Sequence, residues 1–149
     1  MEIVFTKPSD QQHAVKVRRA DGSEESTILN SRSFLRHDLA HLAVEMEIPL
    51  TAGYWGSIAA GASLANPDIK GGDIATAEAL AGPVQTLMRI KAETEQFQNA
   101  LQRVNPELGS DELAARIRER GQRLQGHWQA IPYGGDMILE WHTTHGDQD

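Results

Sequence analysis

The chain has 149 residues, a formal net charge of −7 and no cysteine. This length is typical of one domain with a single hydrophobic core, so we expect one domain over residues 1–149. Without cysteine there is no disulfide framework, no thiolate metal site and no cysteine nucleophile, and the composition fits a reducing, cytoplasmic compartment. The negative charge disfavours nucleic acid or an anionic membrane as a partner, because both bind through positive surface.

The arginine-rich run ARIRERGQR at 115–123 departs locally from this acidic balance. We interpret it as a solvated helix face, so no nucleic-acid partner is predicted. The most apolar window, Gly53–Ala65, is short and rich in small residues, well below the roughly 18 apolar residues that span a bilayer. The N-terminal residues also lack the basic and apolar regions of a signal peptide, so no membrane association is predicted.

The first thirty residues predict strands. HAVKVRR alternates apolar and polar side chains with a period of two, ADGS supplies an Asp-Gly turn, and EESTIL can return as the partner strand. MEIVF is a third candidate strand, which Pro8 ends. We therefore expect a small antiparallel N-terminal sheet over residues 1–30, with Ile3 and Phe5 on the face that other elements must cover.

Residues 33–64 predict a longer helix followed by a short one. In the first, Ser33 is the expected N-cap and Pro49 follows the end, so this helix should run to Ile48. The second, Tyr54–Leu64, consists of small residues that let another element approach closely. On a helical wheel, the core stripe of the longer helix comprises Leu35, Leu39, Leu42 and Met46. Its solvent side comprises Arg36, Ala40 and Glu47.

Residues 73–131 predict an antiparallel helical hairpin. Asp73 can cap the first helical segment, and apolar positions continue in a heptad-like pattern over 83–104. NPELGSDE forms the turn, and Ser110 caps a second helix whose apolar stripe ends at Trp128. The two stripes most simply pack on each other. Alternatively, they form the seam of a homodimer.

The C-terminal segment completes the predicted fold. MILEW, within residues 136–142, is a possible strand with its large apolar side chains on one face, and it could join the N-terminal sheet. Residues 143–149 form a polar tail. The predicted fold class is α+β, with a small antiparallel N-terminal sheet packed on the helix at 33–48 and on a C-terminal antiparallel helical hairpin.

The stretch FLRHDLAHLAVEME contains the side chains that could bind a metal ion or take part in catalysis. His37 and His41 are four residues apart, so their imidazoles project from the same side of a helix and can converge on one divalent metal ion, such as zinc. The spacing is that of the zinc-hydrolase motif HExxH, although the pattern here is HDxxH. Asp38 takes the position of the glutamate general base, one methylene shorter. It is therefore the candidate catalytic base of a hydrolytic reaction.

Such a metal site needs a third ligand. Glu45 lies on the same stripe of the helix and is predicted to be a metal ligand or to orient one. It lies two turns beyond His37, about 12 Å along an unbroken helix, which is far for one ion to collect both side chains. Further candidates elsewhere in the chain are His13, His127, Glu140 and His142.

The alternative is a protein without catalytic activity. Buried polar side chains need hydrogen-bond partners, and the His/Glu stripe could form a structural network that orients Tyr54 or Trp55. The helical hairpin would then bind a partner protein or a second copy of the chain. Stoichiometric metal in the purified protein separates the two hypotheses.

The segments ADGS, FLRHDLAHLAVEMEI and GYWGSIAAG together resemble a small family of uncharacterised bacterial proteins with an N-terminal hairpin and an HDLxHxxxE helix. The resemblance covers residues 14–64 and is only distant to the HExxH zinc hydrolases. The matching positions are His37, Asp38, Leu39, His41, Val44 and Glu45, with Gly53, Trp55 and Gly56 matching more loosely. The resemblance implies that the two histidines and Glu45 act as a set in metal or small-ligand binding, and it assigns no activity.

Overall fold

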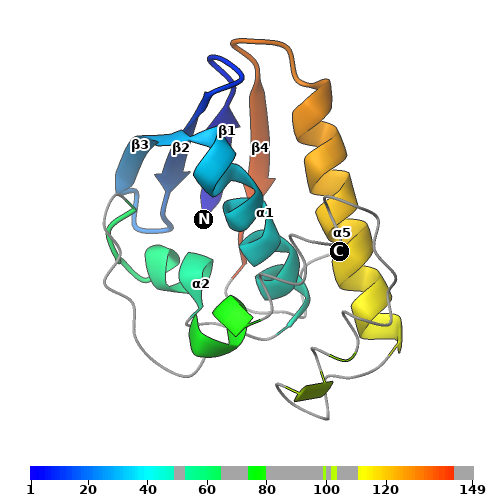
Figure 1. The fold of residues 1–149 in the computed structure, drawn as a ribbon. Coiled ribbons are helices and arrows are strands. Elements are labelled where there is room, and N and C mark those ends of the chain that lie inside the picture. The colour runs from blue at the N-terminus through cyan, green and yellow to red at the C-terminus, as the bar shows by residue number, and fades with distance from the viewer. Residues whose placement is uncertain (49–52, 65–73, 80–98, 100–101, 104–110, 143–149) are drawn as a thin grey trace.

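The computed structural model describes residues 1–48, 53–64, 74–79, 99, 102–103 and 111–142 (Figure 1). Its labelled elements are β1 (Glu2–Thr6), β2 (Gln12–Arg18), β3 (Glu24–Asn30), α1 (Ser31–Glu47), α2 (Tyr54–Ala59), α5 (Asp111–Ala130) and β4 (Asp136–Glu140). Residues 74–79 form a further short helix. The fold class is α+β, as predicted, with a four-stranded antiparallel sheet and helices α1 and α5 packed together.

The sheet has the order β3-β2-β1-β4, and every neighbouring pair is antiparallel. β1 is a central strand, because Phe5 pairs with Val15 of β2 on one side and with Met137 of β4 on the other. The strand at MILEW therefore joins the N-terminal sheet, as predicted, although it begins at Asp136. The turn between β2 and β3 contains Gly22, whose φ of 89° is a conformation that glycine adopts without strain.

One face of the sheet is buried because alternate side chains of its strands point towards the helices. The fully buried side chains on this face are Ile3, Phe5, His13, Val15, Val17 and Met137. α1 lies over it with α5 beside α1 (Figure 1), and the ring of Trp128 from α5 meets Phe5 edge-on at 6.3 Å. Arg120 of α5 also donates to Glu47 at the end of α1 over 2.8 Å. These contacts fix α1, the helix that carries the HDxxH motif, against the sheet.

A buried arginine holds α2 beside the β2–β3 hairpin. Arg19 donates from Nε to the carbonyl of Ile58 over 2.6 Å and from Nη2 to the carbonyl of Ala62 over 2.8 Å. Its guanidinium also pairs with Glu25, whose carboxylate accepts the backbone N–H of Leu64 over 3.3 Å. This Arg19–Glu25 clamp connects the C-terminal end of α2 to the sheet.

Three predictions about helix boundaries and faces are wrong. α1 begins at Ser31, so Ser33 lies inside the first turn and is not the N-cap. α2 ends at Ala59 rather than at Leu64, because Gly61 has a φ of 115° that ends the helix. Ala40 is fully buried instead of facing solvent, because α1 is covered on more sides than a single apolar stripe predicts.

Several predictions fall outside the described residues. These are most of the first hairpin helix, predicted over 83–104, the turn that follows it, and the polar tail at 143–149. The hairpin and its homodimer seam therefore stay predictions. The second hairpin helix corresponds to α5, which packs against α1. Within the described ranges, no helix is both long and apolar enough to span a bilayer.

Candidate metal centre

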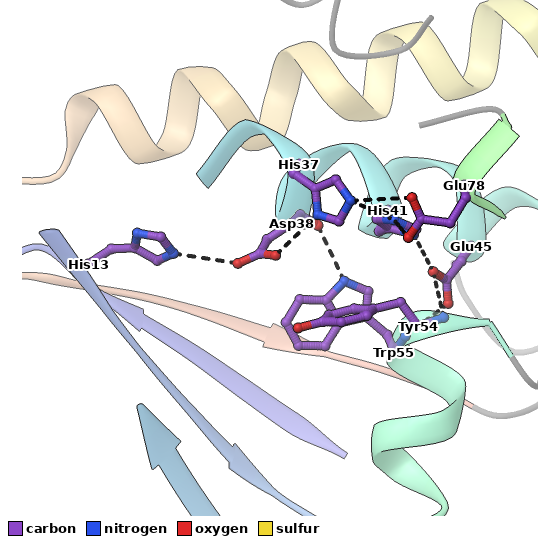
Figure 2. A network of polar contacts seen from close by, with 8 residues as sticks. All are labelled: His13, His37, Asp38, His41, Glu45, Tyr54, Trp55 and Glu78. Carbon is purple, nitrogen blue, oxygen red and sulfur yellow. Dashed lines mark hydrogen bonds and ion pairs between the residues drawn. The ribbon is translucent and has the colours of Figure 1, made fainter. Parts of the chain in front are cut away.

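One face of α1 carries a cluster of ionisable side chains that point towards α2 and the short helix at 74–79 (Figure 2). His41 and Glu45 are fully buried, and Asp38 is 3% exposed. The side chain of His37 is 31% exposed and forms the edge of the cluster. Charged and polar side chains are rarely buried without partners, so each member of this cluster must interact with another polar group or with an ion.

Three side chains converge on one point, two of them from α1 and the third, Glu78, from the helix at 74–79. Nε2 of His41 lies 3.2 Å from Nε2 of His37 and 3.0 Å from a carboxylate oxygen of Glu78. Nε2 of His37 lies 3.5 Å from the other oxygen of Glu78. One ligand atom from each residue lies within 4.8 Å of the others, a separation that a single metal ion can bridge.

Glu45 lies behind His41 and not among the converging atoms. Its carboxylate accepts a hydrogen bond from Nδ1 of His41 over 2.9 Å and from the backbone N–H groups of Tyr54 and Trp55 over 3.0 Å each. Those N–H groups belong to the first turn of α2, which has no side-chain cap from its own N-cap residue, Gly53. Of the two roles predicted for Glu45, this arrangement is that of a residue that orients a ligand.

Asp38, the predicted catalytic base, lies beside the other ring nitrogen of His37. Its Oδ1 is 3.7 Å from Nδ1 of His37, and its Oδ2 is 3.5 Å from Nε2 of the buried His13. The backbone carbonyl of Asp38 accepts the indole N–H of Trp55 over 3.2 Å. The carboxylate is thus placed to orient His37 from inside the core rather than to face solvent.

The two histidines share one pattern. In each ring Nδ1 faces a carboxylate, Asp38 for His37 and Glu45 for His41. Ionised carboxylates only accept hydrogen bonds, so in the neutral ring Nδ1 carries the proton and Nε2 is left with a lone pair. Two lone pairs and the carboxylate of Glu78 then face one another at close range. This arrangement requires a proton or a metal ion between them.

The electrostatics of the cluster favour positive charge. The pKa of His37 is raised above its ordinary value, chiefly by its interaction with Asp38, while partial burial opposes the rise and the charge of Glu78 adds to it. Tyr54 packs against His41 with ring centroids 5.4 Å apart. Burial and then the surrounding carboxylates raise the pKa of Tyr54, so its hydroxyl stays protonated.

Glu78 is a candidate ligand that the sequence did not predict. It lies 37 residues after His41, in a segment that carries no motif and predicts only a helix. Within the described residues, the converging group does not include the other candidates His13, His127, Glu140 and His142. The approach of Glu78 to an HxxxH pair depends on the packing of two separate helices, so no spacing along the chain could identify it.

Comparison of the chain with known protein families, with curated proteins and with solved structures gives no match. The resemblance to the bacterial HDLxHxxxE family therefore stays a prediction from the motif. Function has to be inferred from the geometry of the site.

Proposed function

We propose that the protein binds a divalent metal ion through His37, His41 and Glu78. The supporting observation is the arrangement of the ring nitrogens, since both Nε2 atoms converge with the carboxylate of Glu78 while both Nδ1 atoms face other carboxylates. Carboxylate–histidine–metal triads are common around protein metal sites, because the carboxylate fixes the tautomer of the imidazole and makes it a stronger ligand.

Zinc is the metal that this donor set fits best. Two imidazole nitrogens and one carboxylate oxygen are the protein ligands of many catalytic zinc sites, and the chain has no cysteine for a thiolate site. Calcium and magnesium prefer ligand sets made of oxygen atoms. Iron(II) accepts the same set of two histidines and one carboxylate, so it belongs in the test alongside zinc.

The same site has the features needed for hydrolysis. Three protein ligands leave a fourth position for water, and a bound zinc ion lowers the pKa of such water to about 7. The side chains of Glu78 and His37 are 51% and 31% exposed, so this side of the site is open to a substrate. In this proposal Asp38 acts on His37 and not on the water, and a metal held by His37, His41 and Glu78 would supply the activation of that water.

The metal content of protein purified without a histidine tag tests the proposal. We expect one zinc ion per chain, lost in His41→Ala and bound much more weakly in Glu78→Gln. The matched control is His127→Ala, which removes an exposed histidine of α5 and should keep its zinc. A parent protein that binds neither zinc nor iron(II), even after incubation with each ion, contradicts the proposal. Hydrolysis of an activated ester by the zinc-loaded parent, but not by His41→Ala, tests the reaction separately.

A metal-free hydrogen-bond network is the second candidate function of the cluster. Glu45 favours it, because this carboxylate accepts from His41 within α1 and connects α1 to the first turn of α2 through two further hydrogen bonds. Protons on the imidazoles would then take the place of the metal ion. The expected result is no bound metal, together with a lowered melting temperature for His41→Ala.

A further inference from the structure

We propose that His13 is a positioning residue for the metal centre, which fixes Asp38 and, through Asp38, the orientation and tautomer of His37. This inference rests on the proposed metal-binding function. His13 comes from β2, whereas both imidazole ligands come from α1. The sheet, and not only the motif helix, would therefore determine the geometry of the metal centre.

A continuous chain of polar contacts runs from the start of α1 to the metal centre. The hydroxyl of Ser31 lies 3.1 Å from Nδ1 of His13, and Nε2 of His13 lies 3.5 Å from Oδ2 of Asp38. Oδ1 of the same carboxylate lies 3.7 Å from Nδ1 of His37. Figure 2 shows Asp38 between the two imidazoles, with one carboxylate oxygen directed to each ring.

One assignment of protons satisfies every member of this chain. The hydroxyl of Ser31 donates to Nδ1 of His13, Nε2–H of His13 donates to Asp38, and Nδ1–H of His37 points to the other oxygen of the same carboxylate at 3.7 Å. His37 then presents an unprotonated Nε2 to the metal. In the opposite tautomer of His13, a nitrogen lone pair would face the carboxylate of Asp38 and repel it.

His13 is held firmly enough to transmit this orientation. It is fully buried, and its ring stacks on Phe5 with centroids 6.0 Å apart and an interplanar angle of 23°. The ring of Trp128 meets it edge-on at 6.1 Å. A donor that cannot rotate fixes the position of the carboxylate that accepts from it, and Asp38 itself has almost no contact with solvent.

Packing alone does not explain a histidine–aspartate pair in this core. Apolar side chains of similar volume often replace a buried polar pair without loss of stability. His13 lies on the same face of β2 as the fully buried Val15 and Val17, so an apolar side chain suits this position. The polar pair is explained by the orientation that it imposes on His37.

Zinc affinity, measured by competition with a chromogenic chelator, tests this role. His13→Phe keeps an aromatic ring but removes the donor to Asp38, and it should weaken zinc binding about 10- to 100-fold. His13→Gln keeps an N–H donor near the position of Nε2 and should restore the affinity to near the parent value. Val15→Ala, a core truncation on the same strand, should lower the melting temperature without changing zinc affinity.

The absorption spectrum of the cobalt(II)-loaded protein gives a readout that lower stability does not change. A displaced His37 alters the coordination geometry, so the d–d bands should shift in His13→Phe and not in Val15→Ala. Ser31→Ala removes only the hydroxyl at the far end of the chain and should weaken zinc binding in the same direction, but less. If His13→Phe does not fold, parent affinity in Ser31→Ala counts against the role of His13.

The outcomes distinguish this inference from the proposed function. Zinc bound by the parent and, with equal affinity, by His13→Phe overturns the positioning role and leaves the metal centre in place. Equal losses in His13→Phe, His13→Gln and Val15→Ala also overturn it, because packing then explains the effect. A parent that binds neither zinc nor iron(II) overturns the proposed function itself.

Discussion

Glu45 is the residue that joins the local fold to the candidate metal centre. Its carboxylate is shared between an imidazole of α1 and two backbone N–H groups of α2. The chain passes so close to this carboxylate that a Cβ at Gly53 would lie 2.5 Å from its Oε1. Gly53 has a φ of −74°, so glycine is required here by the space that Glu45 occupies and not by the backbone conformation.

Gly53→Ala should push the carboxylate of Glu45 away from Nδ1 of His41. We expect weaker zinc binding and a free energy of unfolding lower by about 1–3 kcal/mol, the usual cost of overpacking a core. Chelator competition and denaturant titration measure the two effects.

The matched control is Gly126→Ala in α5, where nothing lies within 4 Å of an added Cβ. Alanine in a helix interior stabilises by roughly 0.5–1 kcal/mol relative to glycine, so this variant should be slightly more stable and should keep its zinc. Parent-like stability and zinc affinity in Gly53→Ala would show that the contact with Glu45 is unimportant.

Among individual residues, the sequence predicts the two candidate ligands that belong to α1. His37 and His41 share a face because of their spacing, and this could be read from the motif. The contact of Asp38 could not, because its carboxylate meets His13 of the sheet, which is distant in the sequence. Glu78 could not be predicted either, because it reaches the site from a separate helix whose position is set by tertiary packing.

Among the elements, α2 links the sheet to the candidate metal centre. The Arg19–Glu25 clamp connects its C-terminal end to the β2–β3 hairpin, and Glu45 binds its first turn. A change in the hairpin can therefore reach His41 through α2.

Glu25→Gln tests the clamp through its pH dependence. Hydrogen bonding to Arg19 is the main cause that lowers the pKa of Glu25, so the folded state favours the ionised carboxylate. This contribution to stability is present at pH 7, declines below the ordinary carboxyl pKa of about 4.3, and is lost as the pH falls through the lower folded value. Thermal melts should show Glu25→Gln less stable than the parent at pH 7, with the difference shrinking below about pH 4.

Glu24→Gln is the control for the clamp. Glu24 also has a lowered pKa, caused mainly by its hydrogen bond to Arg18, but both side chains are largely exposed. Exposed ion pairs contribute little to stability, so this variant should melt close to the parent at every pH. A Glu25→Gln deficit that is independent of pH would argue against an ionic clamp.

Bound zinc should stabilise the packing of the helix at 74–79 against α1. Ala77 anchors this short helix in the core, and Glu78 reaches from it to the imidazoles of α1. Hydrogen exchange of the amides at 74–79 should slow when zinc is added to the parent and not when it is added to Glu78→Gln. Unchanged exchange in a parent that binds zinc would exclude Glu78 as a ligand.

The strands were predictable because their side chains alternate with a period of two and one face is buried. The boundaries of the helices were less predictable from the sequence. The end of α2 depends on the left-handed conformation of Gly61, and a glycine in the sequence does not by itself show that conformation. The start of α1 follows β3 directly at Ser31, which leaves no separate loop to mark it.

For the whole molecule, metal binding and folding should be linked. The site joins α1 to a segment more than thirty residues away, so it exists only in the folded chain. Zinc at about a thousand times its dissociation constant should add roughly 4 kcal/mol to the free energy of unfolding. Thermal melts with and without zinc measure this gain, which His41→Ala should lose. A similar gain in both proteins would place the bound zinc elsewhere.

The central position of β1 has a consequence for how the protein is made. On one side β1 pairs with β2, which follows it closely, but on the other side Thr6 meets Asp136, 130 residues later. While the ribosome synthesises the chain, one edge of β1 therefore lacks its partner until residues 136–140 have emerged. An unpaired edge is where strands of other chains can add. The nascent chain therefore exposes the unpaired edge of β1 to aggregation until β4 completes the sheet.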